Sequence, residues 1–310
     1  MPPDELLISV AQPDDAHEWV RLSRLSSGGP RPSPEEQAES AEFRAALSRH
    51  ADTHFIARRG PDAVGLFEFR LLGGAVDLRR IYLLNGLLGT YGPALLARAV
   101  EEARRHGHIL MIESFPASDS RMYIEAGFTV NTRTRMVVSL TGYRPVSVTP
   151  PEGVRLRPVM LDDEPLFARM AYEHYKGTAD APMVSQSLAQ AETVIRPIFH
   201  NEYALLEPSA SRIALDNGGN PEGGILVACH TTDPTDKLAW VLDISIAEGW
   251  RGRGLGKALM YTALNAAHDL GYGRMGLIVT LSNVTALQLY RSLGFEAYGE
   301  TMYEGWIELA

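Results

Sequence analysis

Short segments of this chain alternate hydrophobic with polar residues, and longer segments repeat hydrophobic residues every three or four positions. The first pattern predicts half-buried strands, and the second predicts half-buried helices. In the second half of the chain the expected order is strand 154–158, helices 160–176 and 185–200, strands 203–206, 211–215, 224–230 and 238–246, helix 255–270, strand 274–281, helix 284–293 and a closing hairpin over 295–309. Strands run together and then alternate with helices, so the pattern predicts a mixed α/β (α+β) fold rather than an all-parallel sheet.

The two halves of the chain resemble each other. Each half opens with a short alternating strand that is followed by two aspartates at the start of a helix, at 14–15 and at 162–163. Near its end, each half has a helix with a similar segment, at 123–128 and at 290–295. Such self-similarity predicts a duplicated unit.

The segment 141–153 contains three prolines and two glycines and has no helical period. This composition is typical of a linker. We therefore expect a first domain over 1–140 and a second over 154–310. The glycine- and proline-rich stretch 26–34 leads into two glutamates at a helix start, so we expect it to join two elements of the first domain.

Length and charge narrow the function. The 310 residues are long for one compact core and sufficient for two domains. Hydrophobic residues make up 45% and charged residues 22%, as in ordinary globular proteins. The formal net charge of -9 disfavours nucleic acid as a partner and suits a cationic small molecule.

Several classes of protein are not expected. The one cysteine, Cys229, excludes an intrachain disulfide and a thiolate zinc cluster, and we expect no metal. No apolar run approaches the roughly 18 residues that span a bilayer, and the N-terminal residues lack the pattern of a secretion signal. These features predict a cytoplasmic chain without a membrane partner, and they leave its oligomeric state open.

A glycine-rich turn lies between the strand 241–246 and the next helix. Glycines allow an anion to approach the backbone, and the free amides and positive dipole of a helix start favour phosphate. Arg251, Arg253 and Lys257 add positive charge there. A Walker A loop would need glycine at Arg251, and a dinucleotide fingerprint would need glycine at Lys257, so neither motif matches. A structural turn without a ligand remains the alternative.

A second motif starts at Asn283. Asn283 and Tyr290 are seven residues apart, which places them on one face of a helix. Asn283 occupies a helix-cap position, where its amide serves either the backbone or a ligand. Tyr290 is either a buried core aromatic or a functional hydroxyl. Gly294 suits the end of the helix, with Phe295 packing back onto the core.

Together these motifs resemble the GNAT superfamily of N-acetyltransferases. The resemblance covers about 152–310 and rests on Arg251-Gly252-Arg253-Gly254-Leu255-Gly256 and on Asn283, Ala286, Leu289-Tyr290 and Leu293-Gly294-Phe295. The duplication is similar to that of mycothiol synthase and other double-GNAT proteins. The resemblance implies two GNAT-like domains, each with a mostly antiparallel mixed sheet flanked by helices.

The resemblance also implies acetyl-CoA as co-substrate and a role for each motif residue. The backbone at Ile244 and Ile246, beside a bulge, would hold the acetyl and pantetheine groups. Asn283 would bond the pantetheine arm, and Tyr290 would protonate the departing thiolate. Glu248 replaces a proline common in relatives, which affects only the local loop shape. The pyrophosphate would be held by the amides of Arg251, Gly252, Arg253, Gly254, Leu255, Gly256 and Lys257.

Direct transfer to an amine needs a base, because an ammonium is not a nucleophile. Asp243 is the candidate, and a solvated or capping aspartate is the alternative. Glu173, His174 and Tyr175 lie in a region that lines acceptor sites in this family and are weaker candidates. His230 follows a strand and is expected to be structural.

The first half lacks much of the motif. Leu87, Leu88, Gly89 and Thr90 stand where 251–254 would align, and Pro116 stands in place of Asn283, although Tyr123 matches Tyr290. We expect this domain to be non-catalytic, and whether it binds acetyl-CoA stays open. The leading interpretation is an N-acetyltransferase that acts on a primary amine of a small molecule through its C-terminal domain. The alternatives are a non-catalytic acyl-CoA sensor and a scaffold without a ligand.

Overall fold

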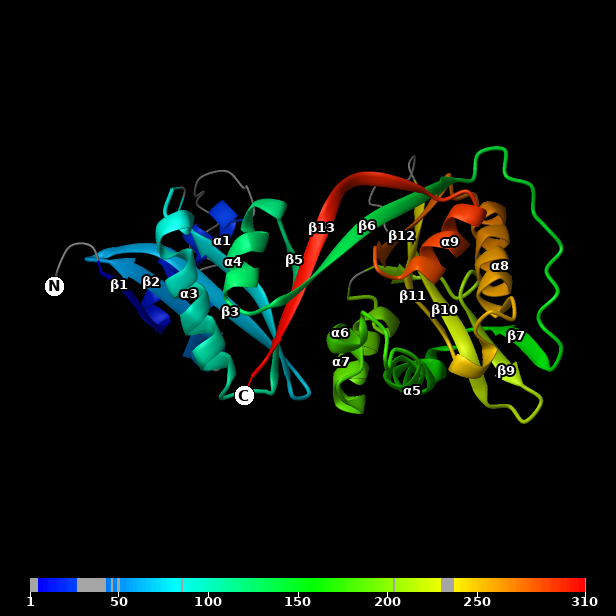
Figure 1. The fold of residues 1–310 in the computed structure, drawn as a ribbon, viewed down its shortest axis with the longest axis horizontal. Coiled ribbons are helices and arrows are strands. Elements are labelled where there is room, and N and C mark those ends of the chain that lie inside the picture. Colours follow the sequence, from blue (N-terminus) through cyan, green and yellow to red (C-terminus); the bar gives the residue numbers. More distant parts are fainter. Residues whose placement is uncertain are drawn as a thin grey trace. The chain divides into compact units, whose positions relative to one another are not determined.

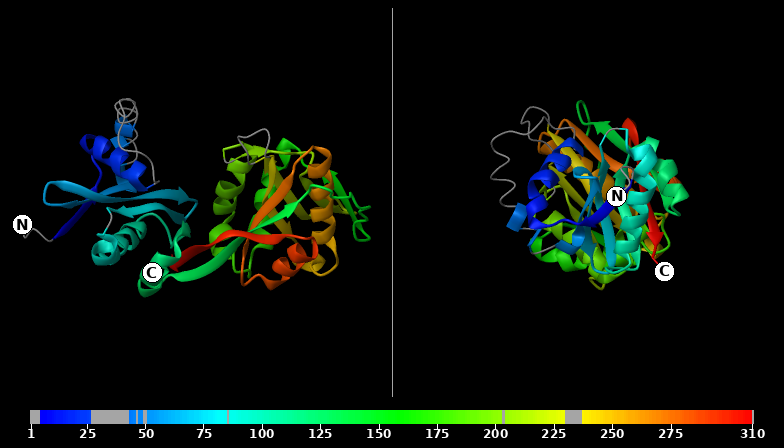
Figure 2. Two further views of the ribbon diagram at one scale, coloured as in Figure 1. Left: turned by 90° about the horizontal axis from the view of Figure 1, so that it is seen from above. Right: turned by 90° about the vertical axis from the view of Figure 1, so that its left-hand side faces the viewer.

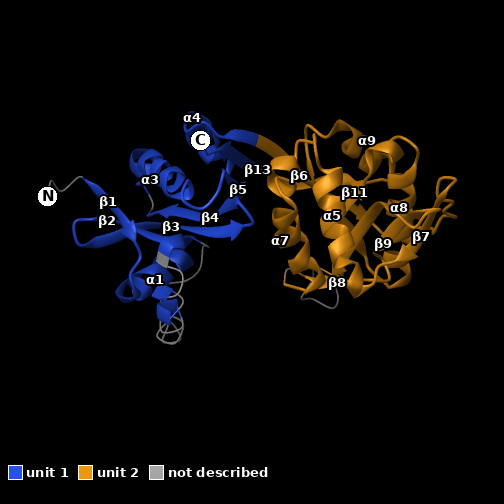
Figure 3. Ribbon diagram, turned by 90° about the horizontal axis from the view of Figure 1, so that it is seen from below, with its two compact units in different colours: residues 1–130, 304–310 blue, residues 131–303 orange. Residues whose placement is uncertain are grey.

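The structure is a computed structural model that describes residues 5–26, 43–45, 47–48, 51–84, 86–202, 204–229 and 237–309. Figures 1 and 2 trace the chain from its N-terminus to its C-terminus. The chain divides into two compact units, which Figure 3 colours separately. Unit 1 comprises 1–130 and 304–310, and unit 2 comprises 131–303.

Unit 1 is a twisted sheet with helices packed on it. Its helices are α1 (Ala16–Ser26), α3 (Leu88–Ala103) and α4 (Ser120–Glu125), with 3₁₀ turns at Pro13–Asp15, Ala51–Thr53 and Ala117–Asp119. Its strands are β1 (Leu6–Val10), β2 (His54–Arg59), β3 (Asp62–Leu72), β4 (Ala75–Leu83) and β5 (Ile109–Phe115). The strand order is β1–β2–β3–β4–β5, antiparallel except for the parallel pair β4–β5.

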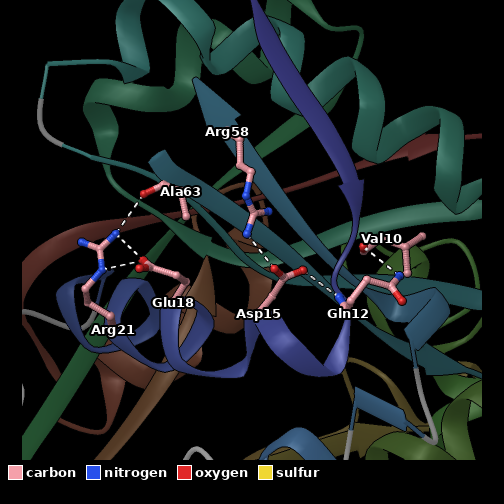
Figure 4. A network of polar contacts seen from close by, with 7 residues as sticks. All are labelled: Val10, Gln12, Asp15, Glu18, Arg21, Arg58 and Ala63. Carbon is pink, nitrogen blue, oxygen red and sulfur yellow. Dashed lines mark hydrogen bonds and ion pairs between the residues drawn. The ribbon is translucent and has the colours of Figure 1, made fainter. Parts of the chain in front are cut away.

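One aspartate of each repeated pair forms hydrogen bonds that stabilise the start of a helix. Asp15 accepts a hydrogen bond from the backbone N–H of Gln12 at 2.8 Å and one from Arg58 at 2.6 Å (Figure 4). At the matching place in unit 2, Asp163 accepts two bonds of 2.7 Å from Arg157. Both carboxylates are therefore used to hold a strand against a helix start.

Unit 2 contains the longer series of elements. Its helices are α5 (Glu164–His174), α6 (Ala181–Val184), α7 (Leu188–Phe199), α8 (Leu255–Asp269) and α9 (Val284–Ser292), with 3₁₀ turns at Leu161–Asp163 and Glu248–Trp250. Its strands are β6 (Thr129–Ser139), β7 (Val154–Pro158), β8 (Leu205–Leu206), β9 (Arg212–Asp216), β10 (Pro221–Cys229), β11 (Leu238–Ile246), β12 (Arg274–Thr280) and β13 (Glu296–Glu308). The strand order is β13–β6–β12–β11–β10–β9–β7, with β8 beside β10, and the central pair β11–β12 is parallel.

Two helical layers cover opposite faces of the unit 2 sheet, as Figure 1 and the left view of Figure 2 show. Leu259 and Met260 of α8 are fully buried in the core on one face. Phe167 of α5 is fully buried on the other face, with α7 beside it. Gly224 allows α5 to approach the sheet, because a Cβ there would lie 2.6 Å from the Phe167 ring. The mixed sheet flanked by helices agrees with the expected fold class.

Three features differ from the sequence expectation. Residues 131–140 lie in unit 2, because 133–139 of β6 pair with 274–280 of β12, and residues 304–310 lie in unit 1. The segment 141–153 has no helix or strand, but it joins β6 to β7 within unit 2. The closing hairpin is instead one strand, β13, because it pairs with β5 and β6 rather than with itself. The expected loop over 27–34 lies outside the described residues.

Candidate active site

A cavity of about 690 Å³ lies in unit 2. Its wall is formed by the end of α5 and the segment after it, the end of β11, the loop 247–254, the first turn of α8 and the helix α9. Most of the residues singled out in the sequence meet at this cavity.

The cavity exists because two parallel strands separate. β11 and β12 pair only where 238–240 lie beside 274–276. At the last of these pairs the ring of Trp240 lies over Gly276, where a Cβ would be 2.3 Å from a ring atom. β11 continues to Ile246, so the backbone of 241–246 is not paired with β12. On this side of β11, backbone groups that a neighbouring strand would otherwise pair are thus left for other partners.

A bulge in β11 sets the direction of its side chains. Leu226 of β10 pairs with Asp243 and Val227 pairs with Val241, so Leu242 has no partner in this ladder. Beyond the bulge, Ile244 and Ile246 pack against the core beneath α8 and line the cavity. Asp243 and Ser245 alternate with them and face the α5 side.

The turn before α8 has the backbone shape that the glycines predicted. Gly252 and Gly254 have positive φ angles of 72° and 86°, and a Cβ on either would meet no atom within 4 Å. The N-cap residue of α8 is Gly254, which has no side chain to accept a hydrogen bond from the first amides of the helix, so these amides stay available. Arg251 braces the turn, because its guanidinium donates to the carbonyl oxygens of Ile246 and His174.

Helix α9 brings Asn283 and Tyr290 to the cavity. The Asn283 side chain accepts the backbone N–H of Ala286 at 3.1 Å, so it caps α9 while it lines the cavity. Tyr290 is only 6% exposed, and its ring lies 5.9 Å from that of Phe295. Burial, and then the charges of Asp243 and Asp180, raise the pKa of Tyr290 well above its usual value. Its hydroxyl therefore keeps its proton at neutral pH and remains a donor.

Asp243 is buried and is reached from the cavity through a tyrosine. It is 8% exposed, and its Oδ1 accepts a hydrogen bond of 2.9 Å from the hydroxyl of Tyr175, which lines the cavity. Among the described residues its Oδ2 has no hydrogen-bond partner. Burial raises the pKa of Asp243 to about 6, and the bond from Tyr175 offsets part of that rise. Its carboxylate is thus poised to take a proton near neutral pH.

Residues 182–295 match the sequence model of the acetyltransferase (GNAT) family. This part of the chain is a GNAT acetyltransferase domain. It contains β11, the glycine-rich turn, α8 and α9, which provide most of the cavity wall.

Curated relatives match parts of the chain. Human N-acetyltransferase 8B is 34% identical over 88 residues, which are 28% of this chain and 39% of the relative. Mycothiol acetyltransferase of Pseudarthrobacter chlorophenolicus is 30% identical over 159 residues, 49% of this chain and 46% of the relative. The chain therefore spans less than half the length of either relative.

A solved structure matches the whole chain. It is a tandem GNAT protein from the clavulanic acid biosynthesis pathway, with a TM-score of 0.54 at 20% identity, covering 99% of both chains. At this identity the likeness shows the fold, two successive GNAT folds, and not the substrate.

The cavity of the GNAT domain gathers most of the expected site residues. Those that line it are Ile244, Ile246, Arg251, Gly252, Gly254, Gly256, Lys257, Asn283 and Tyr290. Three others do not: Arg253 lies over the Trp250 ring at 5.5 Å, Leu255 is fully buried in the core, and Asp243 lies behind Tyr175. Only the backbone of Leu255 is then available to a ligand.

The three weaker candidates for the base, at the end of α5, differ in whether they line the cavity. His174 and Tyr175 line the cavity, whereas Glu173 is exposed and forms an ion pair of 3.0 Å with Lys176. Burial, and then the positive charge of Arg251, lower the pKa of His174 to about 4, so it is neutral at pH 7. His230 lies outside the described residues.

Sequence reasoning missed Asp180 and Ser245, which also line the cavity. Ser245 lies two residues after Asp243 on a strand, a spacing that could have indicated the shared face. Asp180 lies between α5 and α6 and receives a hydrogen bond from Thr280 across 100 positions of sequence. No local pattern links these two.

In 5–26, 43–45, 47–48, 51–84, 86–202, 204–229 and 237–309, no three His, Cys, Asp or Glu side chains are placed to share a metal ion. In the same part of the chain, no helix is both long and apolar enough to cross a bilayer.

Proposed function

We propose that the chain is an acetyl-CoA-dependent N-acetyltransferase in which unit 2 acetylates a primary amine of a small molecule. The observation that carries the proposal is one cavity wall that combines a cationic, amide-rich turn with Tyr290 and the Tyr175–Asp243 hydrogen bond. Members of the GNAT family use acetyl-CoA and act on amines.

The turn before α8 suits the pyrophosphate of the donor. Its positive-φ glycines leave the backbone open, and the helix start presents free amides and a positive dipole. Arg251 and Lys257 add positive charge on the same wall. In this proposal the unpaired edge of β11 at Ile244 and Ile246 bonds the pantetheine and acetyl groups, and the amide of Asn283 bonds the pantetheine arm.

The proposed reaction is a direct transfer. The neutral amine forms a bond to the thioester carbonyl carbon, and the resulting oxyanion is stabilised by a backbone N–H of β11. The carbon–sulfur bond then breaks, and Tyr290 donates its proton to the thiolate. The nitrogen loses a second proton as the intermediate collapses, and an equivalent proton returns to the Tyr290 oxygen, which balances the proton given to sulfur.

Asp243 is the proposed base, and it acts through Tyr175. The acceptor ammonium gives a proton to the Tyr175 oxygen while the Tyr175 hydroxyl proton moves to Asp243 Oδ1. The hydrogen bond of 2.9 Å between these two groups supports this path. The position of Asp243 behind the cavity wall explains why a relay is needed.

Unit 1 is proposed to be non-catalytic. Its helix α3 starts at Leu88, and the carbonyl of Leu87 accepts the amides of Thr90 and Tyr91, so the counterpart of the phosphate turn is helical. No lysine or arginine occurs between 84 and 96. A helical turn without cations lacks the means by which unit 2 would hold a pyrophosphate.

Native mass spectrometry of the intact chain with acetyl-CoA tests this proposal. We expect one acetyl-CoA per chain, none on the Arg251→Ala, Gly254→Val double variant, and acetylation of amines only by the wild type. Two bound molecules would overturn the account of unit 1. Binding without acetylation of any amine in a broad panel would favour the sensor, and no binding would leave a fold without the function.

A further inference from the structure

Two carboxylates beside the cavity lack a positive partner. Asp180 lines the cavity, and Asp243 adjoins it behind Tyr175. Among the described residues, no lysine, arginine or histidine forms an ion pair with either of them. Asp243 is buried, and burying a carboxylate without a counter-charge is unfavourable. Such a pair is retained more readily where a cationic ligand completes it.

The Asp180 carboxylate does not cap the helix that follows it. Asp180 precedes the short helix α6, but its side chain makes no capping hydrogen bond. The contact that its carboxylate does make is with Thr280, whose hydroxyl donates to Oδ1. This bond orients the carboxylate at the cavity wall without neutralising its charge.

Two nearby polar atoms, in Ser245 and Asp243, have no hydrogen-bond partner among the described residues. Ser245 lines the cavity and is 5% exposed, yet its hydroxyl oxygen has no hydrogen-bond partner among the described residues. The same holds, in this part of the chain, for Oδ2 of Asp243. Leaving a buried polar atom without a hydrogen bond is unfavourable. Ser245 lines the cavity and its hydroxyl oxygen accepts hydrogen bonds, so a ligand with an N–H donor there would satisfy it.

The two carboxylates act together on the tyrosines of the site. The charges of both Asp243 and Asp180 raise the pKa of Tyr175 and of Tyr290, after burial, which is the largest cause. Both charges therefore reach the place at which the acceptor must meet the thioester. An acceptor with a carboxylate of its own would be repelled there.

We propose that Asp180 binds a second positive charge on the acceptor, so that the natural acceptor is a small dibasic amine. This inference rests on the proposed function and names its substrate class. The reacting nitrogen gives its proton through Tyr175 to Asp243, whereas the charge of Asp180 is left for an ammonium or guanidinium that does not react. Ser245 accepts a further hydrogen bond from one of these nitrogens.

Three probes of similar length test the inference: putrescine with two ammonium groups, butylamine with one, and γ-aminobutyrate with a carboxylate in place of the second. We expect kcat/KM for putrescine to exceed that for butylamine by about tenfold to a hundredfold, and γ-aminobutyrate to be the poorest. Asp180→Asn keeps the acceptor for Thr280 and should collapse the putrescine preference through KM. Asp180→Glu should restore part of it.

The matched control is Glu173→Gln, which removes the same charge from an exposed residue near the cavity and should preserve the preference. Calorimetric titration of putrescine in the presence of CoA gives a readout that is independent of turnover. Putrescine that binds through Asp180 but is never acetylated would refute the proposed function and keep this subsite. Acetylation of butylamine and putrescine with equal efficiency, or equal losses for both in Asp180→Asn, would overturn the inference.

Discussion

The two units share a scaffold and differ in the groups placed on it. In unit 1, β4 and β5 pair only where 75–77 lie beside 109–111, and the ladder between β3 and β4 skips Arg79. In unit 2, β11 and β12 likewise pair at three positions, and the ladder between β10 and β11 skips Leu242. Separated parallel strands and a bulge are thus features of the fold in both units.

The matching positions carry different chemistry. Counting from the bulge, Arg80 of unit 1 stands where Asp243 stands, and it donates to Ser23. Tyr123 matches Tyr290, but its ring packs 4.2 Å from that of Phe115 and 5.4 Å from that of Phe128. The two units thus share a strand arrangement but not the side chains placed on it, and the fold alone does not fix the chemistry.

The sharpest test of this comparison uses the two matched tyrosines. Tyr290→Phe should lower kcat by roughly 10²-fold or more, because it removes the proposed proton donor, while acetyl-CoA binding is retained. Tyr123→Phe removes the same atom from unit 1 and should leave kcat unchanged. Steady-state kinetics with the best amine measures both, and equal losses would mean that the tyrosines serve packing alone.

The pH dependence of the reaction tests the position after the bulge, which Asp243 occupies in unit 2 and Arg80 occupies in unit 1. Burial raises the pKa of Asp243 to about 6, and Asp243 must be ionised to accept a proton. The wild-type kcat/KM should therefore fall as pH drops below about 6. Asp243→Asn and Tyr175→Phe should each be slow throughout and lack that limb. A limb that persists in both variants would assign the base elsewhere.

Ionisation of Asp243 should lower the stability of the fold, although it is needed for the proposed activity. Asp243 titrates near 6 in the folded protein and near its ordinary value of 3.8 when unfolded. As pH rises from about 4 to about 6 the unfolded chain loses this proton first, so the free energy of unfolding falls. Asp243→Asn should be more stable than the wild type at pH 8 by up to about 3 kcal/mol and equal to it near pH 4. Chemical denaturation of both proteins at both pH values measures this difference. A wild type that is more stable than Asp243→Asn at pH 8 would refute the prediction.

The smallest expected effect compares two glycines. Gly254 precedes α8 with φ 86°, and Gly86 precedes α3 with φ 85°, and a Cβ on either would meet no atom within 4 Å. Alanine at either position should cost about 1 kcal/mol of stability, because a side chain disfavours positive φ. Only Gly254→Ala should also weaken acetyl-CoA binding. Thermal unfolding with and without acetyl-CoA separates the two effects, and equal ligand shifts would remove the distinction between the units.

Much of the cavity wall proposed to bind acetyl-CoA was predictable from local patterns. The glycine-rich turn, helix α8 and the shared face of Asn283 and Tyr290 follow from turn chemistry and helical periodicity, which act within a few residues. The repeated aspartates correctly indicated equivalent helix starts in both halves. The boundaries and the closing hairpin were missed, because β6 and β13 choose partners far away in the sequence.

The acceptor side depended on tertiary structure. The hydroxyl of Tyr175 meets Asp243 across 68 positions, and that of Thr280 meets Asp180 across 100. Their pairing depends on how α5 and the segment after it pack on the ends of β11 and β12. Burial, which raises the pKa of Asp243, also arises only when these elements come together. Local chain chemistry thus sufficed to predict the proposed phosphate-binding turn, whereas the proposed acceptor subsite required distant residues to be brought together in the folded chain.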